Sequence, residues 1–413
     1  MDIQEQLAEL RRKITRIDQK YANATPALPA PATWPGRLRP ARYFVEELIS
    51  GQVVETSAGE HFETEKLYQR HRRHGSMDIS TLIDLPDDLL DSLSGNTILK
   101  SHPKRWAFLD TETTGLAGGA GTYAFLIGVG SIDEEGFRVR QFFMRDFGEE
   151  SSLLARLTEH LSNFDVLITY NGKTYDVPLL ETRYRMARAK PPFARLAHLD
   201  LLHGARRLWK LRLDSCRLVD LENQILGLER EGDLPGEMIP YYYFQYLRTQ
   251  QAFQLVPIFH HNVMDIVSLA CLTAVVPFAF RSPADAALRH GADLVGLARW
   301  LAQAERFEEA VSLYRRAVDL GLPDNLLFKT LWEIGRLEKK LERYAAAVAV
   351  YTDLAAAKNP YRVSALEELA KYYERRECNY AMALEMTGSA LAFEDSEPLR
   401  RRERRLKTKM ARG

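Results

Sequence analysis

The stretch Trp106–Gly115 reads WAFLDTETTG and places two carboxylates at the end of an apolar run. The run Trp106–Leu109 is typical of a short buried strand. Residues i and i+2 of a strand point to the same face, so Asp110 and Glu112 are expected to project together. Two carboxylates so close repel each other unless one is protonated or a cation lies between them. Oxygen ligands of this kind suit Mg²⁺ and Mn²⁺.

Composition bounds the class of protein around this stretch. The chain has 413 residues, 46% hydrophobic and 27% charged, with a formal net charge of zero. These values predict a globular protein of two or three domains, and the net charge points to no particular partner. The three cysteines are far apart, which excludes a CxxC metal site and favours a reducing cytosol. No apolar run reaches the roughly 18 residues of a membrane span, and no signal peptide is recognised, so we expect a cytoplasmic protein without membrane contact.

The chain divides by pattern into five parts. Residues 1–22 have a heptad seam and predict an amphipathic helix, which either docks on its own protein or pairs with another chain. Residues 23–40 are rich in Ala and Pro and form a linker. Residues 41–100 are an extension of mixed pattern. Residues 101–280 form the next domain and residues 285–413 the last.

Strand and helix patterns alternate through residues 101–280. Apolar runs at 123–131, 137–145 and 165–170 predict strands, and residues 149–161 predict a helix. The order of strands and helices predicts an α/β domain with a mixed central sheet flanked by helices.

An internal repeat marks residues 285–413. The segments RFEEA, RYAAA and NYAMA end at Ala310, Ala347 and Ala383, which are 37 and 36 residues apart. Each follows another helical stretch, so the pattern resembles tetratricopeptide-type helical hairpins, whose period is about 34 residues. Such units stack into a concave surface suited to a partner. The alternative is a generic helical bundle.

Further candidates for the acidic site lie downstream. Asp176 follows the strand LITY and begins a helix, and the same position would also suit a helix cap. The segment 254–275 has helical periodicity, so His261 and Asp265, four residues apart, share one face. A lone carboxylate on so apolar a helix is costly to bury, which favours a function for Asp265.

These motifs together resemble a known superfamily. Asp110-x-Glu112, then Asn171-Gly-Lys-Thr-Tyr-Asp176, then His261-Asn-x-x-Asp265 are similar to the DEDD 3′–5′ exonucleases, which have a ribonuclease H-like fold. The second motif is similar to that of the proofreading domains of family B DNA polymerases, whereas His261 stands where those have tyrosine. The chain most resembles the YprB-like group (mitomycin repair factor B), which joins such a domain to C-terminal tetratricopeptide repeats.

The resemblance implies roles for five side chains. Asp110, Glu112, Asp176 and Asp265 would bind two divalent ions, Mg²⁺ or Mn²⁺, and His261 would be the general base. Paired ions stabilise both the attacking and the leaving oxygen of a phosphodiester displacement, and a histidine suits proton removal near neutral pH. Lys173 and Tyr175, which flank Asp176, are expected to contact the substrate. The resemblance further implies a role in DNA repair, alongside a helicase or another protein partner.

A basic stripe follows the Asp176 motif. Ten Lys or Arg residues lie between positions 182 and 217, among them Arg183, Arg185, Arg206 and Arg207. Beside a metal site they suit a phosphate backbone, and the interleaved aromatic residues suit base stacking. The alternative is a set of solvated helix faces with the aromatic rings in the core.

We therefore interpret the chain as a metal-dependent 3′–5′ exonuclease acting on DNA. One alternative is the same chemistry on RNA, because contacts to the 2′-hydroxyl are not visible in a sequence. The other is a non-catalytic scaffold that binds nucleic acid or protein. The sequence leaves open whether the nucleic acid is single- or double-stranded, from which end it is degraded, and whether cleavage is exo- or endonucleolytic. It also leaves open the metal, the oligomeric state and the partner of the repeat domain.

Overall fold

The computed structural model describes residues 43–91, 100–115, 121–230 and 232–411. The expected helix at 1–22 and linker at 23–40 lie outside these residues. The chain forms two compact units, both built from separate segments. The first comprises the residues up to Arg70 with Lys104–Leu196 and Glu229–Val267. The second comprises His71–Pro103, Ala197–Leu228 and Ser268–Gly413.

A mixed seven-stranded sheet forms the framework of the fold, in the order β1-β2-β7-β6-β5-β8-β9. Antiparallel pairing joins β5 to β6, whereas β5 and β8 are parallel. This sheet with its flanking helices confirms the predicted α/β class. The strands are β1 (Gln52–Thr56), β2 (Gly59–Gln69), β5 (Trp106–Thr113), β6 (Ala124–Ile132), β7 (Gly136–Phe143), β8 (Val166–Thr169) and β9 (Ala197–Asp200), with a separate hairpin of β3 (Arg73–His74) and β4 (Met77–Asp78).

Strand β5 runs further than its apolar run suggests. Its pairing with β6 continues through Asp110↔Gly128 to Glu112↔Leu126, and only then does the register shift. Trp106, Ala107 and Phe108 are fully buried because the strand has neighbours on both sides and helices on both faces. Both carboxylates therefore belong to a rigid central strand rather than to the loop after it.

Helices α5 (Glu150–Leu161) and α10 (Leu255–Arg281) cover opposite faces of the sheet. Phe142 of β7 packs on His160 of α5, with ring centroids 5.5 Å apart. The next residue, Phe143, points the other way and lies 5.0 Å from Phe259 of α10. The first unit also holds α2 (Val45–Leu48), α6 (Asp176–Met186) and α9 (Ile239–Thr249).

Glycines in β6 let α10 lie close against the sheet. A Cβ at Gly128 would lie 2.2 Å from Asn262 Oδ1, and one at Gly130 would lie 2.6 Å from Ile266 Cγ2. Gly128 is the register partner of Asp110, so this approach brings α10 to the first carboxylate. The helical stretch Ala252–Arg281 is long and apolar enough to cross a membrane, but 78% of its apolar window is buried inside the protein. That burial is what a core helix shows.

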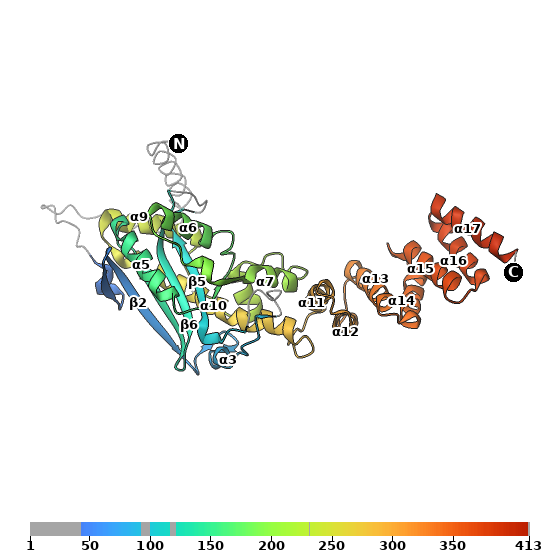
Figure 1. Cartoon of the computed structure of the whole chain (residues 1–413), viewed down its shortest axis with the longest axis horizontal. Coiled ribbons are helices and arrows are strands. Elements are labelled where there is room, and N and C mark those ends of the chain that lie inside the picture. Colours follow the sequence, from blue (N-terminus) through green and yellow to red (C-terminus); the bar gives the residue numbers. More distant parts are fainter. Residues whose placement is uncertain (1–42, 92–99, 116–120, 231, 412–413) are drawn as a thin grey trace, which may run out of the picture. The chain divides into compact units, whose positions relative to one another are not determined.

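The end of the second unit is a succession of helices (Figure 1). Ala310, Ala347 and Ala383, the repeated alanines, are at most 3% exposed. Before each of them a turn residue with positive φ, Glu305, Glu342 or Cys378, ends the preceding helix. The predicted helical repeat region is therefore helical throughout, with a recurring hairpin; its tetratricopeptide identity stays a prediction. Besides the C-terminal part of α10, the α-helices described in the second unit are α3 (Ser80–Ile83), α7 (Leu201–Trp209) and α8 (Leu218–Leu221), followed by those of the repeat region: α11 (Gly291–Gln303), α12 (Phe307–Asp319), α13 (Asp324–Lys340), α14 (Tyr344–Ala356), α15 (Arg362–Arg375), α16 (Tyr380–Phe393) and α17 (Glu397–Met410).

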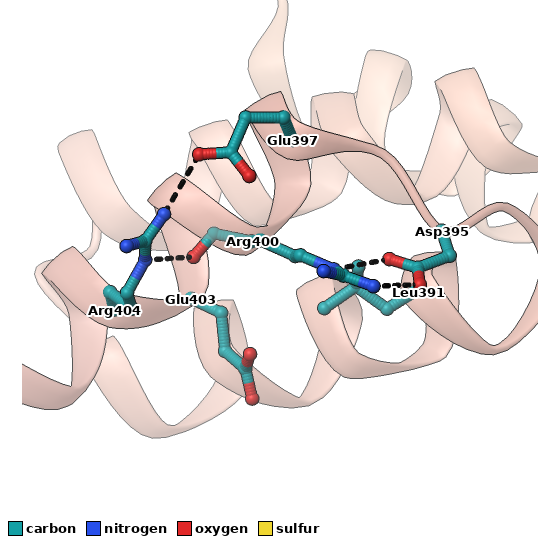
Figure 2. A pocket seen from close by; sticks show the side chains of 6 residues that line it. All are labelled: Leu391, Asp395, Glu397, Arg400, Glu403 and Arg404. Atoms are coloured by element: carbon teal, nitrogen blue, oxygen red, sulfur yellow. Dashed lines mark hydrogen bonds and ion pairs between the residues drawn. The ribbon is translucent and has the colours of Figure 1, made fainter.

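The last helix, α17, is basic, and its charges are paired within the protein. The buried Glu374 of α15 receives Arg402, Arg405 and Lys409 at 2.9, 2.7 and 3.0 Å. Figure 2 shows the start of α17, where Arg400 pairs with Asp395 and Arg404 with Glu397. The helix therefore closes the end of the helical region instead of forming a free basic arm.

Candidate active site

Strand β5 presents Asp110 and Glu112 on the face that α10 covers. Asn262 of α10 donates from Nδ2 to Asp110 Oδ2 at 2.8 Å. The amide of Asn262 is itself held, because Gln141 Nε2 donates to its Oδ1 at 2.8 Å. Glu112 is only 8% exposed. The charges of His261 and Asp265 on α10 act on Glu112, so both carboxylates lie near the same helix, as the two-residue spacing predicts.

Asp176, the first residue of α6, joins these carboxylates from a second segment. It is 6% exposed, and Thr111 Oγ1 donates to its Oδ1 at 2.5 Å. The turn before it contains Asn171 in the left-handed region, with φ of 67°. Tyr175, not Asp176, precedes the first turn of α6, and Asp176 is held by the β5 threonine. Its position is thus tied to the strand that carries the other two carboxylates.

Helix α10 supplies His261 and Asp265 as a third segment. They lie one turn apart, with His261 Nε2 3.9 Å from Asp265 Oδ2. Their side chains are 17% and 20% exposed, so this part of the cluster reaches solvent. The helical spacing of four residues had predicted this shared face.

Arg230 and Asp233, which the sequence interpretation did not single out, complete the cluster. Asp233 accepts a hydrogen bond from His261 Nδ1, with Oδ1 2.9 Å away. Arg230 Nη1 donates to Asp233 Oδ2 at 3.1 Å, and Arg230 Nη2 donates to Asp265 Oδ1. Both residues lie in an irregular segment between Gly227 and the short helix η5 (Gly236–Met238). In the sequence, EREGD (229–233) looks like a solvated loop, and its three acidic residues and one basic residue beside a glycine were the only signal of a function.

The electrostatics show that the cluster is short of positive charge. Burial, reinforced by the charges of Asp265, Glu112 and Asp176, raises the pKa of Asp110 well above its usual value. Burial likewise raises the pKa of Glu112 to about 8, against the opposing effect of His261. The effect on Asp110 also places carboxylates of all three segments within electrostatic reach of one another.

The Asp233–His261 pair is held strongly in its charged form. Burial lowers the pKa of His261, but the hydrogen bond to Asp233 and the charges of Asp265 and Glu112 outweigh it and raise the pKa to about 9. The pKa of Asp233 falls to about 2, because the hydrogen bond from His261 and the charges of His261 and Arg230 outweigh its burial. Asp233 therefore keeps a proton on Nδ1 and leaves Nε2 as the atom that can exchange one.

The donor set fits a divalent cation in its chemistry. Carboxylate oxygens are the ligands that Mg²⁺ and Mn²⁺ take, and a cation would relieve the repulsion on Asp110 and Glu112. As the side chains lie, however, no three His, Cys, Asp or Glu residues within the described ranges form a group placed to hold an ion. Asp265 is instead engaged by Arg230. Binding of an ion would therefore require side chains to turn.

We expect the free energy of unfolding of the metal-free protein to fall as pH rises from about 6.5 to about 9, above the range in which the lowered pKa of His160 acts in the opposite direction. The folded-state pKa of Glu112 lies above its ordinary 4.5, so the stability that its protonated form contributes is lost as pH rises through about 8. His261, raised to about 9, acts in the same direction. The contribution of Glu112 is at most about 4 kcal/mol. Urea unfolding in EDTA at several pH values measures this slope; Glu112→Gln should flatten it, and stability that rises over this range would contradict the assignment.

The residues expected to contact substrate differ in how exposed their side chains are. Lys173 is exposed, and Tyr175 is half-buried with its hydroxyl 3.1 Å from Thr113 Oγ1. Arg185 is exposed, whereas Arg183 is 3% exposed and donates from Nε to Glu150 Oε1 at 2.6 Å. The role of Arg183 in this structure is to join α6 to the start of α5.

The basic stripe continues into a second compact unit. Arg206 and Arg207 are exposed on α7, which belongs to the second compact unit. Tyr184, Phe193 and Trp209, the interleaved aromatic residues, are buried. For these rings the core interpretation applies, because aromatic side chains at helical spacing fill the space under their own helices.

Comparison with known proteins agrees with this fold. Residues 107–276 match a family model described as the RNase H superfamily. A protein of Bacillus subtilis (strain 168), named "Uncharacterized protein YprB", is 32% identical over 357 residues, which cover 83% of this chain and 84% of that protein. The family B DNA polymerase of the hyperthermophilic archaeon Pyrobaculum calidifontis matches with a TM-score of 0.31 and 14% identity over 50% of this chain and 30% of the polymerase. This last likeness is too low to carry an argument about fold or function.

Proposed function

The chain belongs to the YprB family and carries an RNase H superfamily domain, and on this basis we propose that it is a divalent-metal-dependent nuclease. The substrate we favour is DNA, degraded from its 3′ end. The observation that carries the proposal is that carboxylates of β5, α6 and α10 lie within electrostatic reach of one another, beside a histidine that is hydrogen-bonded to Asp233. Carboxylates that repel one another are costly to bury, and a bound cation would offset that cost.

Asp110, Glu112, Asp176 and Asp265 are the residues that would hold the metal. A divalent ion bound there would supply Lewis-acid stabilisation of the phosphodiester oxygens. A divalent ion bound there would also offset the negative charge that raises the pKa of His261, so that the neutral ring could take the proton of the attacking water at Nε2 while Asp233 holds the proton on Nδ1. Asn262 fixes the rotation of Asp110, and the exposed Lys173, three residues before Asp176, offers a charge to the phosphate backbone.

The polarity and the substrate rest on the order of the three motifs, which is that of the 3′–5′ exonucleases. The test uses single- and double-stranded DNA and RNA, labelled at either end, with the purified protein in Mn²⁺. A ladder that shortens from the 3′ end of DNA and stops with EDTA is the expected result. If products form from RNA alone, the substrate is RNA and not DNA. Full cleavage in excess EDTA would overturn the proposal.

One observation favours a second candidate, a non-catalytic domain that binds nucleic acid. Arg230 already neutralises Asp265, and within the described part of the chain no three ligands are ready for a metal. Such a domain would bind the same oligonucleotides with an affinity that neither Mn²⁺ nor EDTA changes, and no product would form. Measuring binding and cleavage on the same samples separates the two candidates.

We also propose that the helical region binds a protein partner acting in DNA repair, such as a helicase. Trp332 and Tyr361 stack across two helical hairpins with ring centroids 5.6 Å apart, and both are only partly buried. Partly exposed aromatic side chains are common anchors of protein interfaces. If Trp332→Ala leaves the binding of a purified helicase unchanged, this pair is not the anchor.

A further inference from the structure

A buried arginine lies against one of the candidate metal ligands. The Arg230 side chain is 6% exposed, and its Nη2 donates to Asp265 Oδ1. Its Nη1 donates to Asp233 Oδ2 at 3.1 Å and lies 3.4 Å from His261 Nδ1. A carboxylate oxygen bonded to a guanidinium offers the same lone pairs that a metal ion needs. Arginine and metal are therefore alternative partners for Oδ1 of Asp265.

The charge of the cluster explains why a cation belongs there. Asp110, Glu112, Asp176 and Asp265 are close enough to disfavour one another's ionised forms at Asp110. A guanidinium stays charged at every pH at which proteins fold, so Arg230 supplies a permanent positive charge to this group. When no ion is bound, Arg230 supplies part of the positive charge that a metal ion would supply.

The main chain around Arg230 is irregular. Arg230 lies outside any helix or strand, in the segment between Gly227 and Gly232. Both glycines have left-handed φ angles, 62° and 69°, and a Cβ at either would meet nothing within 4 Å. The main chain is therefore not packed against neighbouring atoms at these two positions.

Resting on the proposed nuclease function, we propose that Arg230 is a built-in cation that competes with the divalent metal for Asp265. It holds the Asp265 carboxylate while the ion is absent. On metal binding the hydrogen bond from Nη2 to Asp265 Oδ1 breaks, and the oxygen becomes a metal ligand. The arginine thereby keeps the metal-free site folded and also sets how much metal is required to fill it.

The test is the binding of Mn²⁺ to the full chain, measured by calorimetry, together with the melting temperature in EDTA. Arg230→Met removes the competitor, so Mn²⁺ should bind roughly tenfold or more tightly, because a charge-assisted hydrogen bond no longer has to break. The same variant should melt lower in EDTA and gain more from Mn²⁺ than the wild type. Arg230→Lys, which keeps the charge but cannot hold Asp233 and Asp265 with one fork, should show a smaller gain in the same direction.

Arg145→Met is the matched control, because Arg145 pairs with Glu46, Glu60 and Glu149 and with none of the cluster carboxylates. It should leave the Mn²⁺ affinity unchanged. Unchanged or weaker Mn²⁺ binding in Arg230→Met overturns the proposal and makes Arg230 a support that positions Asp265 for the metal. If Arg230→Met does not fold, absence of any gain in Arg230→Lys overturns it instead. Failure of the nuclease proposal looks different: the wild type itself would bind no Mn²⁺ that depends on Asp110 and Glu112.

Discussion

Replacing Asp110 by Asn and Glu112 by Gln together should reduce cleavage by at least about 10³-fold and leave the protein folded. The lost activity follows from removing two of the four oxygen ligands that would hold the metal, whose stabilisation of the reacting phosphate is worth several kcal/mol. The retained fold follows from the electrostatics of the site. Burial and mutual repulsion raise the pKa of both carboxyls, so their ionised forms destabilise the metal-free protein. Neutral isosteres remove that repulsion.

Cleavage rate in Mn²⁺ and melting temperature in EDTA near pH 8 are the two measurements for this double variant. The melting temperature should equal or exceed that of the wild type. Asp133→Asn with Glu135→Gln is a matched control, because these residues are also two apart but lie in the β6–β7 turn, paired with Arg138. Activity that survives in the Asp110/Glu112 variant would place the reaction elsewhere. A cooperative loss of fold would mark the pair as structural.

The regular strands and helices could be predicted because burial of one face makes apolar residues recur in the sequence at the spacing of a strand or a helix. Strand β5, the β6–β7 hairpin and helix α10 follow from apolar runs and helical spacing. Strands β1 and β2 show no such period. The buried residues of β2 include His61 and Glu63 beside Phe62, and His61 is satisfied by Ser152 Oγ at 2.9 Å. Buried polar residues paired across the fold hide the apolar alternation that a strand would otherwise show.

The carboxylates of the site could be predicted because their spacing is local: two residues on a strand, and four on a helix between His261 and Asp265. Arg230 and Asp233 could not, because nothing in an irregular segment tells which side chains return to a site some 30 residues away. Because of Arg230, Asp265→Asn should lower the stability of the metal-free protein, since the buried arginine would lose one of its two carboxylate ion pairs.

Replacing Asp233 by Asn should lower the turnover number by about 10²–10⁴-fold with little change in KM. Asp233 accepts the Nδ1 proton of His261 and so leaves Nε2 to take the proton of water. An asparagine amide can instead donate to Nδ1, which moves the ring proton to Nε2 and leaves the histidine unable to act as a base. Single-turnover cleavage measures the loss. Glu229→Gln, an exposed carboxylate in the same segment, is the control and should be silent.

Two further measurements separate this positioning role from a merely structural one. NMR titration of the metal-free protein should show the pKa of His261 falling from about 9, since the hydrogen bond to Asp233 is the largest effect that raises it. In a His261→Asn background, Asp233→Asn should have no further effect on turnover, because Asp233 acts through the histidine. If Asp233→Asn slows the His261→Asn protein as much as it slows the wild type, Asp233 acts through its other partner, Arg230. In that case the Asp233–His261 pair does not provide the general base.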